Sequence, residues 1–173
     1  MPLKARQAPS PSEIDQHFMG LALAEAMAAG LRQEVPIGAV LVDAGGVVLA
    51  QEGNRTIELS DPTAHAEILV LRAGGQRLGN YRLTGATLFV TLEPCLMCMG
   101  AMIHARLSRL VFASLDPKAG AAVSRYQVGR DQQLNHTLII EQGPLSGQCS
   151  DLLRNFFQAR REGGARPEQV SMS

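Results

Sequence analysis

Apolar and polar positions along the first third of the chain predict a helix followed by a β-hairpin. Two short apolar runs, 39–42 and 47–50, flank the turn-forming residues Asp-Ala-Gly-Gly, as in two antiparallel strands. Before them, apolar residues recur every three or four positions, the spacing of one helix face, at Ile14, Phe18, Leu21, Ala24, Ala28 and Leu31. We therefore expect an amphipathic helix that ends near residues 30–32, and then a hairpin.

The rest of the chain predicts an alternation of helices and strands. A second helix is expected to open at Asp61-Pro62 and to stop at Gly74-Gly75. Further helices are expected at 95–106 and 149–161. A buried strand is expected at 86–92, and further strands at 109–115 and 137–141. Strands separated by helices favour an α/β sandwich whose sheet is parallel in part.

Length and composition favour one compact unit. The 173 residues are 46% hydrophobic, enough for one sizeable core but not for two. We predict one domain over residues 11–162. A disordered N-terminal extension is expected at 1–10, and a flexible tail rich in Gly, Pro and Ser at 163–173.

Charge and cysteine content exclude several classes of protein. Sixteen Lys and Arg balance sixteen Asp and Glu, so net charge alone predicts no polyanionic partner. No segment approaches the roughly 18 apolar residues that a membrane span needs. Three cysteines do not make the disulfide framework of a small secreted protein. We expect a soluble protein of the reducing cytoplasm, with no membrane partner.

Two of the three cysteines, Cys95 and Cys98, lie three positions apart at the start of a predicted helix, directly after Pro94. Residues at i and i+3 face the same side of a helix, and its N-terminus favours thiolates. Two thiolates there make half of a tetrahedral zinc site, and a thioredoxin-like redox pair fits the same position equally well. The cysteine pair alone does not decide between the two.

His65 and Glu67, 30 and 28 residues before Cys95, favour the metal. One histidine and two cysteines give three ligands and leave the fourth position for water, as in catalytic zinc sites. A carboxylate two residues from a ligand is placed to take a proton from that water, whose pKa zinc lowers. Positions i and i+2 inside a helix point to nearly opposite sides, so we expect non-helical backbone at His65. A surface or capping role is the alternative for this histidine.

The pair of motifs, H-x-E and then P-C-x-x-C, resembles the signature of the zinc deaminases. The similarity to the bacterial tRNA-specific adenosine deaminases extends over roughly residues 15–162. It is carried by EVPIGAV (34–40), NR (54–55), DPTAHAEI (61–68), NYRLTGATLFVTLEPCLMCMGAMIHARL (80–107) and FFQARR (156–161).

The resemblance implies a cytidine-deaminase-like fold, a three-layer α/β/α sandwich around a five-stranded mixed sheet. It implies one Zn²⁺ per subunit and hydrolytic deamination of adenosine to inosine at the wobble position of a tRNA anticodon loop. The expected substrate is an anticodon stem-loop, that of tRNA-Arg in particular. The family works as a homodimer whose two subunits both contribute to the RNA cleft.

Site residues follow from the resemblance by position. The zinc ligands are His65, Cys95 and Cys98, and the proton carrier is Glu67. Substrate contacts are expected from Ile37, from the Asn54 side chain, and from the backbone N–H groups of Ala66 and Cys95. The expected RNA contacts are Asp116 and Lys118 in a loop, and Phe157, Arg160 and Arg161 near the end of the chain.

Three other interpretations remain open. A deaminase of a free nucleobase or nucleoside, of the cytosine, adenosine or guanine type, shares the zinc signature. A zinc-stabilised binding domain would not need Glu67. A redox protein would hold no stoichiometric metal and would form a reversible disulfide between Cys95 and Cys98. We expect Cys149 and the methionines at 97, 99 and 102 to pack in the core or at a dimer interface.

Overall fold

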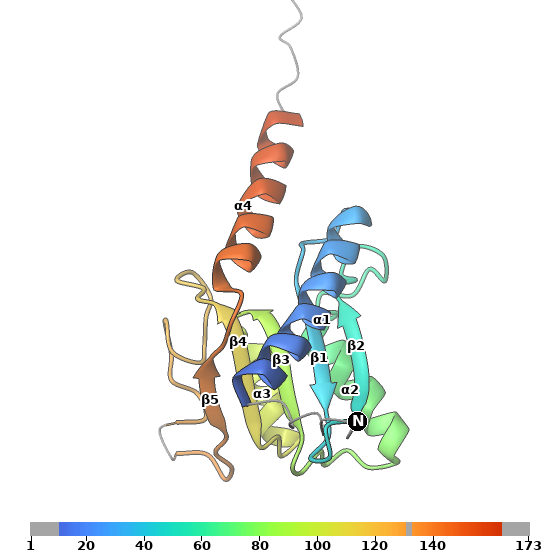
Figure 1. The fold of residues 1–173 in the computed structure, drawn as a ribbon, viewed down its shortest axis with the longest axis vertical. Coiled ribbons are helices and arrows are strands. Elements are labelled where there is room, and N and C mark those ends of the chain that lie inside the picture. Colours follow the sequence, from blue (N-terminus) through green and yellow to red (C-terminus); the bar gives the residue numbers. More distant parts are fainter. Residues whose placement is uncertain (1–10, 131–132, 164–173) are drawn as a thin grey trace, which may run out of the picture.

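The computed structural model describes residues 11–130 and 133–163 as one sheet with helices on both faces (Figure 1). In chain order the elements are α1 (Pro11–Leu31), β1 (Gly38–Val42), β2 (Val48–Gly53), α2 (Ala66–Leu78), β3 (Thr87–Leu92), α3 (Leu96–His104), β4 (Arg109–Ser114), β5 (Ile139–Gln142) and α4 (Ser146–Gly163). The predicted extension at 1–10 lies outside the described residues. So does the predicted tail, except for residue 163, which ends α4.

The five strands form a mixed sheet in the order β2-β1-β3-β4-β5. The hairpin of β1 and β2 is antiparallel, and so is the pairing of β1 with β3. β3, β4 and β5 run parallel to one another. The predicted five-stranded mixed sheet and its parallel half are confirmed.

Side chains alternate across the central strands and build one core on each face of the sheet. In β1, Ala39 and Leu41 join the core that α2 and α3 cover, whereas Val40 and Val42 join the core under α1. Strands buried on both faces carry continuous apolar runs, and all five residues of β1 are buried. The result is three layers, with α1 and α4 on one face and α2 and α3 on the other (Figure 1).

The predicted end of α1 and the hairpin are confirmed, but three of the six positions expected on the apolar face of α1 are exposed, namely Ile14, Ala24 and Leu31. Leu31 is 85% exposed and Ile14 is 38% exposed. The residues that α1 buries are Phe18, Met19, Ala22, Ala26 and Ala29. α1 lies so close to the sheet that a Cβ at Gly38 would come within 2.0 Å of the Ala22 carbonyl oxygen. Close packing therefore selects an alanine-rich face, and the larger apolar residues lie outside it.

Both predicted ends of α2 are also wrong. Asp61 accepts hydrogen bonds from the N–H and hydroxyl of Thr63, so residues 61–65 form a turn and the helix starts only at Ala66. Gly74 stays inside the helix, where a Cβ would lie 2.3 Å from the side chain of Leu41. The helix ends at Gly79, whose positive φ of 61° suits glycine. Within 11–130 and 133–163, no helix is long and apolar enough to cross a membrane.

Candidate active site and metal centre

The N-termini of α2 and α3 meet at the candidate site, and each carries a predicted ligand at its N-cap. His65 has extended backbone, with φ −72° and ψ 149°, and Cys95 has φ −76° and ψ 173°. The predicted non-helical backbone at His65 is confirmed. Because the N-cap residue lies just before the regular turns, its side chain can point past the end of the helix. Cys98 lies one turn into α3 and is buried.

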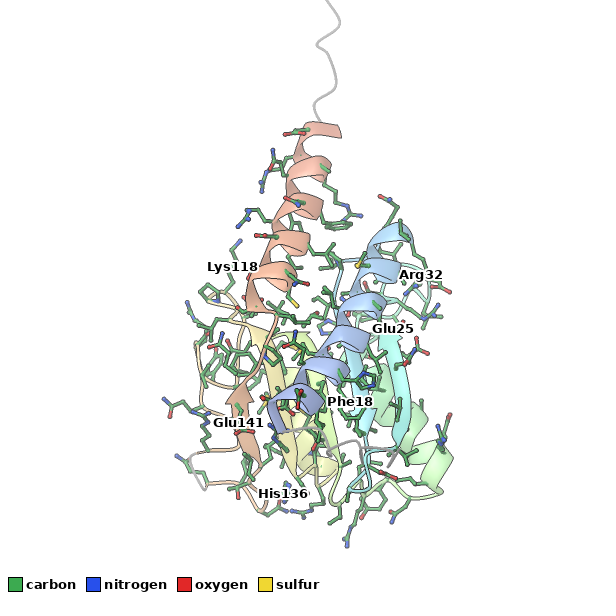
Figure 2. The ribbon with its side chains drawn as sticks, in the orientation of Figure 1. Phe18, Glu25, Arg32, Lys118, His136 and Glu141 are labelled. Atoms are coloured by element: carbon green, nitrogen blue, oxygen red, sulfur yellow. The ribbon has the colours of Figure 1, made fainter. Side chains whose placement is uncertain are left out.

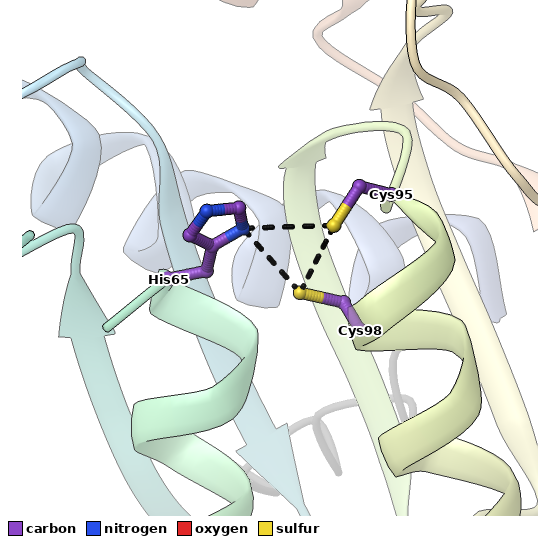
Figure 3. Close-up of side chains that lie close together, drawn as sticks. All are labelled: His65, Cys95 and Cys98. Atoms are coloured by element: carbon purple, nitrogen blue, oxygen red, sulfur yellow. Dashed lines mark hydrogen bonds between the residues drawn. The ribbon is translucent and has the colours of Figure 1, made fainter. Parts of the chain in front are cut away.

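The three predicted ligands lie within reach of one another (Figure 3). The His65 Nδ1 atom lies 3.7 Å from the Cys95 Sγ atom and 3.6 Å from the Cys98 Sγ atom. The two sulfurs are 3.7 Å apart, and both cysteines are free thiols. A tetrahedral zinc ion, with bonds of about 2.3 Å to sulfur and about 2.1 Å to nitrogen, requires about 3.8 Å between sulfurs and about 3.6 Å between nitrogen and sulfur. The donor set fits zinc in both chemistry and spacing.

The electrostatics of the cluster favour a thiolate. The Cys98 thiol beside Cys95 lowers the pKa of Cys95 to about 4, and His65 adds to this effect. The same contact with Cys95, together with burial, raises the pKa of Cys98. The hydrogen bond between the His65 ring and the Cys95 sulfur raises the pKa of His65. The imidazole and the sulfurs thus compete for protons, and a divalent cation would displace those protons as it binds.

Glu67 lies in the first turn of α2, two residues after His65, and is only 4% exposed. Burial raises the pKa of its carboxyl group. The Cys98 thiol lies beside it. A carboxyl group with a raised pKa accepts and releases a proton more readily near neutral pH, as a general acid–base group requires.

Asn54 follows β2 and fixes the start of α2. Its Oδ1 atom accepts a hydrogen bond of 2.9 Å from the Ala66 N–H, and its own N–H donates to the Ile37 carbonyl over 3.0 Å. Ile37 and Asn54, both predicted to contact substrate, are therefore neighbours beside the first turn of α2. The Ala66 N–H is already donated to Asn54, so a substrate that used this donor would have to share or replace that bond.

Asp116 and Lys118 lie in the segment after β4, close to the cysteine ligands. Cys95 and Gly120 form an isolated antiparallel bridge, and the Ala121 N–H donates to the Pro94 carbonyl. Asp116 accepts hydrogen bonds from the N–H groups of Lys118 and Ala119. Lys118 is exposed and projects outward (Figure 2).

The predicted RNA contacts of the last helix lie on a part of α4 that extends past the sheet (Figure 1). Cys149 is buried in α4, as predicted. Phe157, by contrast, is 42% exposed. The Arg160 guanidinium lies 4.9 Å from the Phe156 ring centre and donates to the Gln33 carbonyl at the end of α1. Arg161 is exposed.

Two buried carboxylates next to the site were missed at the sequence level. Glu34 is 1% exposed and accepts hydrogen bonds from Thr56, Ile57 and Glu58, in the turn after Asn54. Glu93, two residues before Cys95, is 2% exposed and accepts bonds from the segment after β4. Glu93 stands inside the quoted motif, but its partners are 23 to 31 residues further along the chain. No local pattern points to them.

Comparison with known proteins agrees with this geometry. The model of the cytidine and deoxycytidylate deaminase zinc-binding region matches residues 12–114, which include His65, Glu67, Cys95 and Cys98. The chain is 49% identical over 151 residues to the tRNA-specific adenosine deaminase of Haemophilus influenzae, covering 87% of each chain.

Two solved structures are similar to different degrees. One comes from studies of A-to-I editing by tRNA:A34 deaminases at the wobble position of transfer RNA. It is 48% identical with a TM-score of 0.77, covering 80% of this chain and 99% of the other. The guanine deaminase of Bacillus subtilis is 28% identical with a TM-score of 0.56, covering 88% of this chain and 97% of the other. These matches confirm the cytidine-deaminase-like fold predicted from the sequence.

Proposed function

This chain belongs to the zinc-binding cytidine and deoxycytidylate deaminase family, and we propose that it acts as a tRNA-specific adenosine deaminase. It converts adenosine to inosine by hydrolysis at the wobble position of a tRNA anticodon loop. One observation carries the chemistry: His65, Cys95 and Cys98 lie at the spacings of a tetrahedral metal site, with the buried Glu67 beside them. The relative at 49% identity and the structure at 48% support an RNA substrate.

The proposed zinc ligands are His65, Cys95 and Cys98, with one ion per subunit. Bound zinc would act as a Lewis acid that makes a hydroxide nucleophile available near neutral pH. The Glu67 carboxylate takes a proton from the attacking water and gives it to the adenine ring nitrogen. It then takes the proton of the newly added hydroxyl group and delivers it to the departing amine. Water adds, ammonia leaves, and the C–NH₂ group of the base becomes C=O. The burial of Glu67 supports this role, because burial raises the pKa of its carboxyl group and so makes proton uptake easier.

Substrate contacts are proposed on both sides of the metal cluster. The Asn54 side chain uses its oxygen for Ala66, which leaves its amide N–H groups as the donors for the flipped nucleotide. Ile37 offers an apolar contact. The Cys95 N–H is the proposed donor to the reacting oxygen, and the Ala66 N–H, which donates to Asn54, would share that bond with the base. Asp116, Lys118, Phe157, Arg160 and Arg161 are the proposed contacts to the flanking nucleotides, through charge and stacking.

We also propose a homodimer, an anticodon stem-loop of tRNA-Arg as the substrate, and the cytoplasm as the place where that tRNA is met. A groove of about 790 Å³ between α2 and α3 supports the dimer. Its lining includes Leu71, Tyr81, Ala101 and His104, and Tyr81 is 69% exposed. Apolar surface of this kind on the outer helices suits contact with a second copy.

The proposal is tested by giving the purified protein an anticodon stem-loop with a wobble adenosine and, separately, free adenosine, cytosine and guanine. We expect inosine in the RNA and no turnover of the free compounds. Turnover of a free base or nucleoside would favour the alternative that the guanine deaminase structure represents. Zinc binding without any turnover would favour a binding domain.

A further inference from the structure

The Glu93 carboxylate accepts hydrogen bonds from the segment 116–124. Its Oε1 atom accepts the N–H groups of Ala122, Val123 and Ser124 over 3.2, 2.7 and 2.8 Å. Its Oε2 atom accepts the Asp116 N–H over 3.0 Å and the Ser124 hydroxyl. Five donors meet one side chain, so the group must serve purely as an acceptor. An ionised carboxylate does so, and a carboxamide cannot.

The same segment also contacts the backbone of Pro94 and Cys95, just before α3. The Ala121 N–H donates to the Pro94 carbonyl over 2.8 Å, and Gly120 pairs with Cys95. There is no room for a side chain at this point, because a Cβ at Gly120 would lie 2.3 Å from the Glu93 Oε2 atom and 2.6 Å from the Asp116 carbonyl oxygen. Two features therefore hold this segment close to residues 93–95: the hydrogen bonds of Glu93, and the missing side chain at Gly120.

We infer that Glu93 is a positioning residue. It fixes the segment carrying Asp116 and Lys118 against Pro94 and Cys95, just before α3, and so sets where flanking RNA lies relative to the reacting base. This inference rests on the proposed function. Glu93 itself is 2% exposed and does not reach the RNA, so it acts through the backbone that it holds. Lys118 is exposed on the segment, and the Asp116 carboxylate shapes the turn that presents it.

Glu93→Gln tests the inference, because it keeps the shape of the side chain and replaces one acceptor oxygen with an N–H₂ donor. That donor would face either the three N–H groups at Oε1 or the Asp116 N–H at Oε2, and the segment should loosen. We expect zinc content to stay at the wild-type value, KM for the stem-loop to rise about tenfold, and kcat at saturating RNA to change little.

Gly120→Ala should reproduce this result with the carboxylate intact, because the new methyl group drives the segment away from Glu93. Glu25→Gln is the matched control. Glu25 lies on α1, accepts one hydrogen bond from Gln51, and loses the same charge without touching the segment. We expect it to keep the wild-type KM. A merely structural role for Glu93 would lower stability without separating KM from kcat.

Hydrogen exchange separates failure of this inference from failure of the proposed function. In Glu93→Gln, the amides of Ala122, Val123 and Ser124 should exchange faster, whatever the substrate is. Unchanged exchange, loss of zinc, or a fall in kcat with KM unchanged would each overturn the inference. If wild-type protein does not act on the stem-loop, the proposed function fails. The exchange result then still decides whether Glu93 holds the segment.

Discussion

Glu67 is a carboxyl group enclosed by protein next to the three candidate metal-binding atoms, and its proposed value to catalysis lies in that setting. An exposed glutamate would be ionised throughout the neutral range and would hold a proton poorly. Burial raises the pKa of Glu67, so the group can carry a proton from water to base and to leaving amine.

Replacing Glu67 with Gln should abolish turnover while the fold and the metal remain. The amide matches the carboxylate in shape but cannot take up the proton, and general acid–base catalysis contributes roughly 10²- to 10⁴-fold. Single-turnover assays on the stem-loop, with zinc measured on the same samples, check this. Activity near the wild-type level would show that the carboxylate is dispensable, as a zinc-stabilised binding domain requires.

Cys98→Ala should remove both zinc and activity, because only two of the three ligands remain. Cys149→Ala is the matched control, since Cys149 is also buried but lies in α4, away from the cluster. We expect the control to keep its zinc and its turnover, with some loss of stability from the small cavity. Zinc measured by mass spectrometry in both variants decides the point. Equal zinc in the two would exclude Cys98 as a ligand.

At the scale of elements, the central strands β1, β3 and β4 were predictable because their sequences are largely apolar and buried. The N-cap position of His65 followed from the i, i+2 geometry. The face of α1 was not predictable, because alanine and larger apolar residues surround this helix on several sides. The choice among them is made by the sheet, which Gly38 allows to approach closely. The end of α2 depends on a left-handed conformation at Gly79, and the sequence offers Gly74 and Gly75 as equal candidates.

The turn after β2 depends on Glu34, and this gives the stability of the protein a pH dependence. Burial alone would raise the pKa of Glu34, but the N–H groups of Glu58 and Ile57 and the Thr56 hydroxyl together hold it below its ordinary value of 4.5. A lowered folded-state pKa means that the ionised carboxylate stabilises the fold above the unfolded-state pKa. That contribution is lost as the pH falls through the folded-state value.

Glu34→Gln should therefore be less stable than wild type at pH 7, by about 1–3 kcal/mol, because the amide supplies one acceptor oxygen where the carboxylate supplied two. The difference should shrink as the pH falls below about 4.5, where the Glu34 carboxylate of the unfolded chain begins to protonate, and should vanish below the lower folded-state pKa. Urea unfolding of both proteins over a series of pH values measures the two curves. A difference that stays constant down to the acid limit would mean that the Glu34 charge does not hold the turn.

For the molecule as a whole, local motifs predicted the metal cluster, but the contacts that surround it join segments distant in sequence. The motifs H-x-E and P-C-x-x-C contain Glu67 and all three candidate ligands. The resemblance of these motifs to the zinc deaminases therefore predicted that the four residues lie together. Glu34 and Glu93 bond to segments that the fold brings to them, more than 20 residues away. A single sequence gives no measure of such pairings. A single sequence likewise does not indicate which surface would contact a second copy of the chain.

The proposed dimer makes a prediction about the groove between α2 and α3. Wild-type protein should sediment as a dimer, and Ala101→Arg, which puts a charge in the groove, should sediment as a monomer. The monomeric variant should also turn over the stem-loop more slowly than wild type, because both subunits are expected to form the RNA cleft. Val47→Arg, on the exposed hairpin turn, should remain a dimer with full turnover. Wild-type protein that sediments as a monomer at assay concentrations would contradict the proposal.

The most direct test of hydrolytic deamination follows the oxygen atom. Wild-type protein is incubated in ¹⁸O-labelled water with a stem-loop whose anticodon carries one wobble adenosine, and the RNA is digested and analysed by mass spectrometry. Our account predicts inosine at that position with the heavy isotope in its new carbonyl group. Adenosine left intact, or inosine without the label, would contradict it.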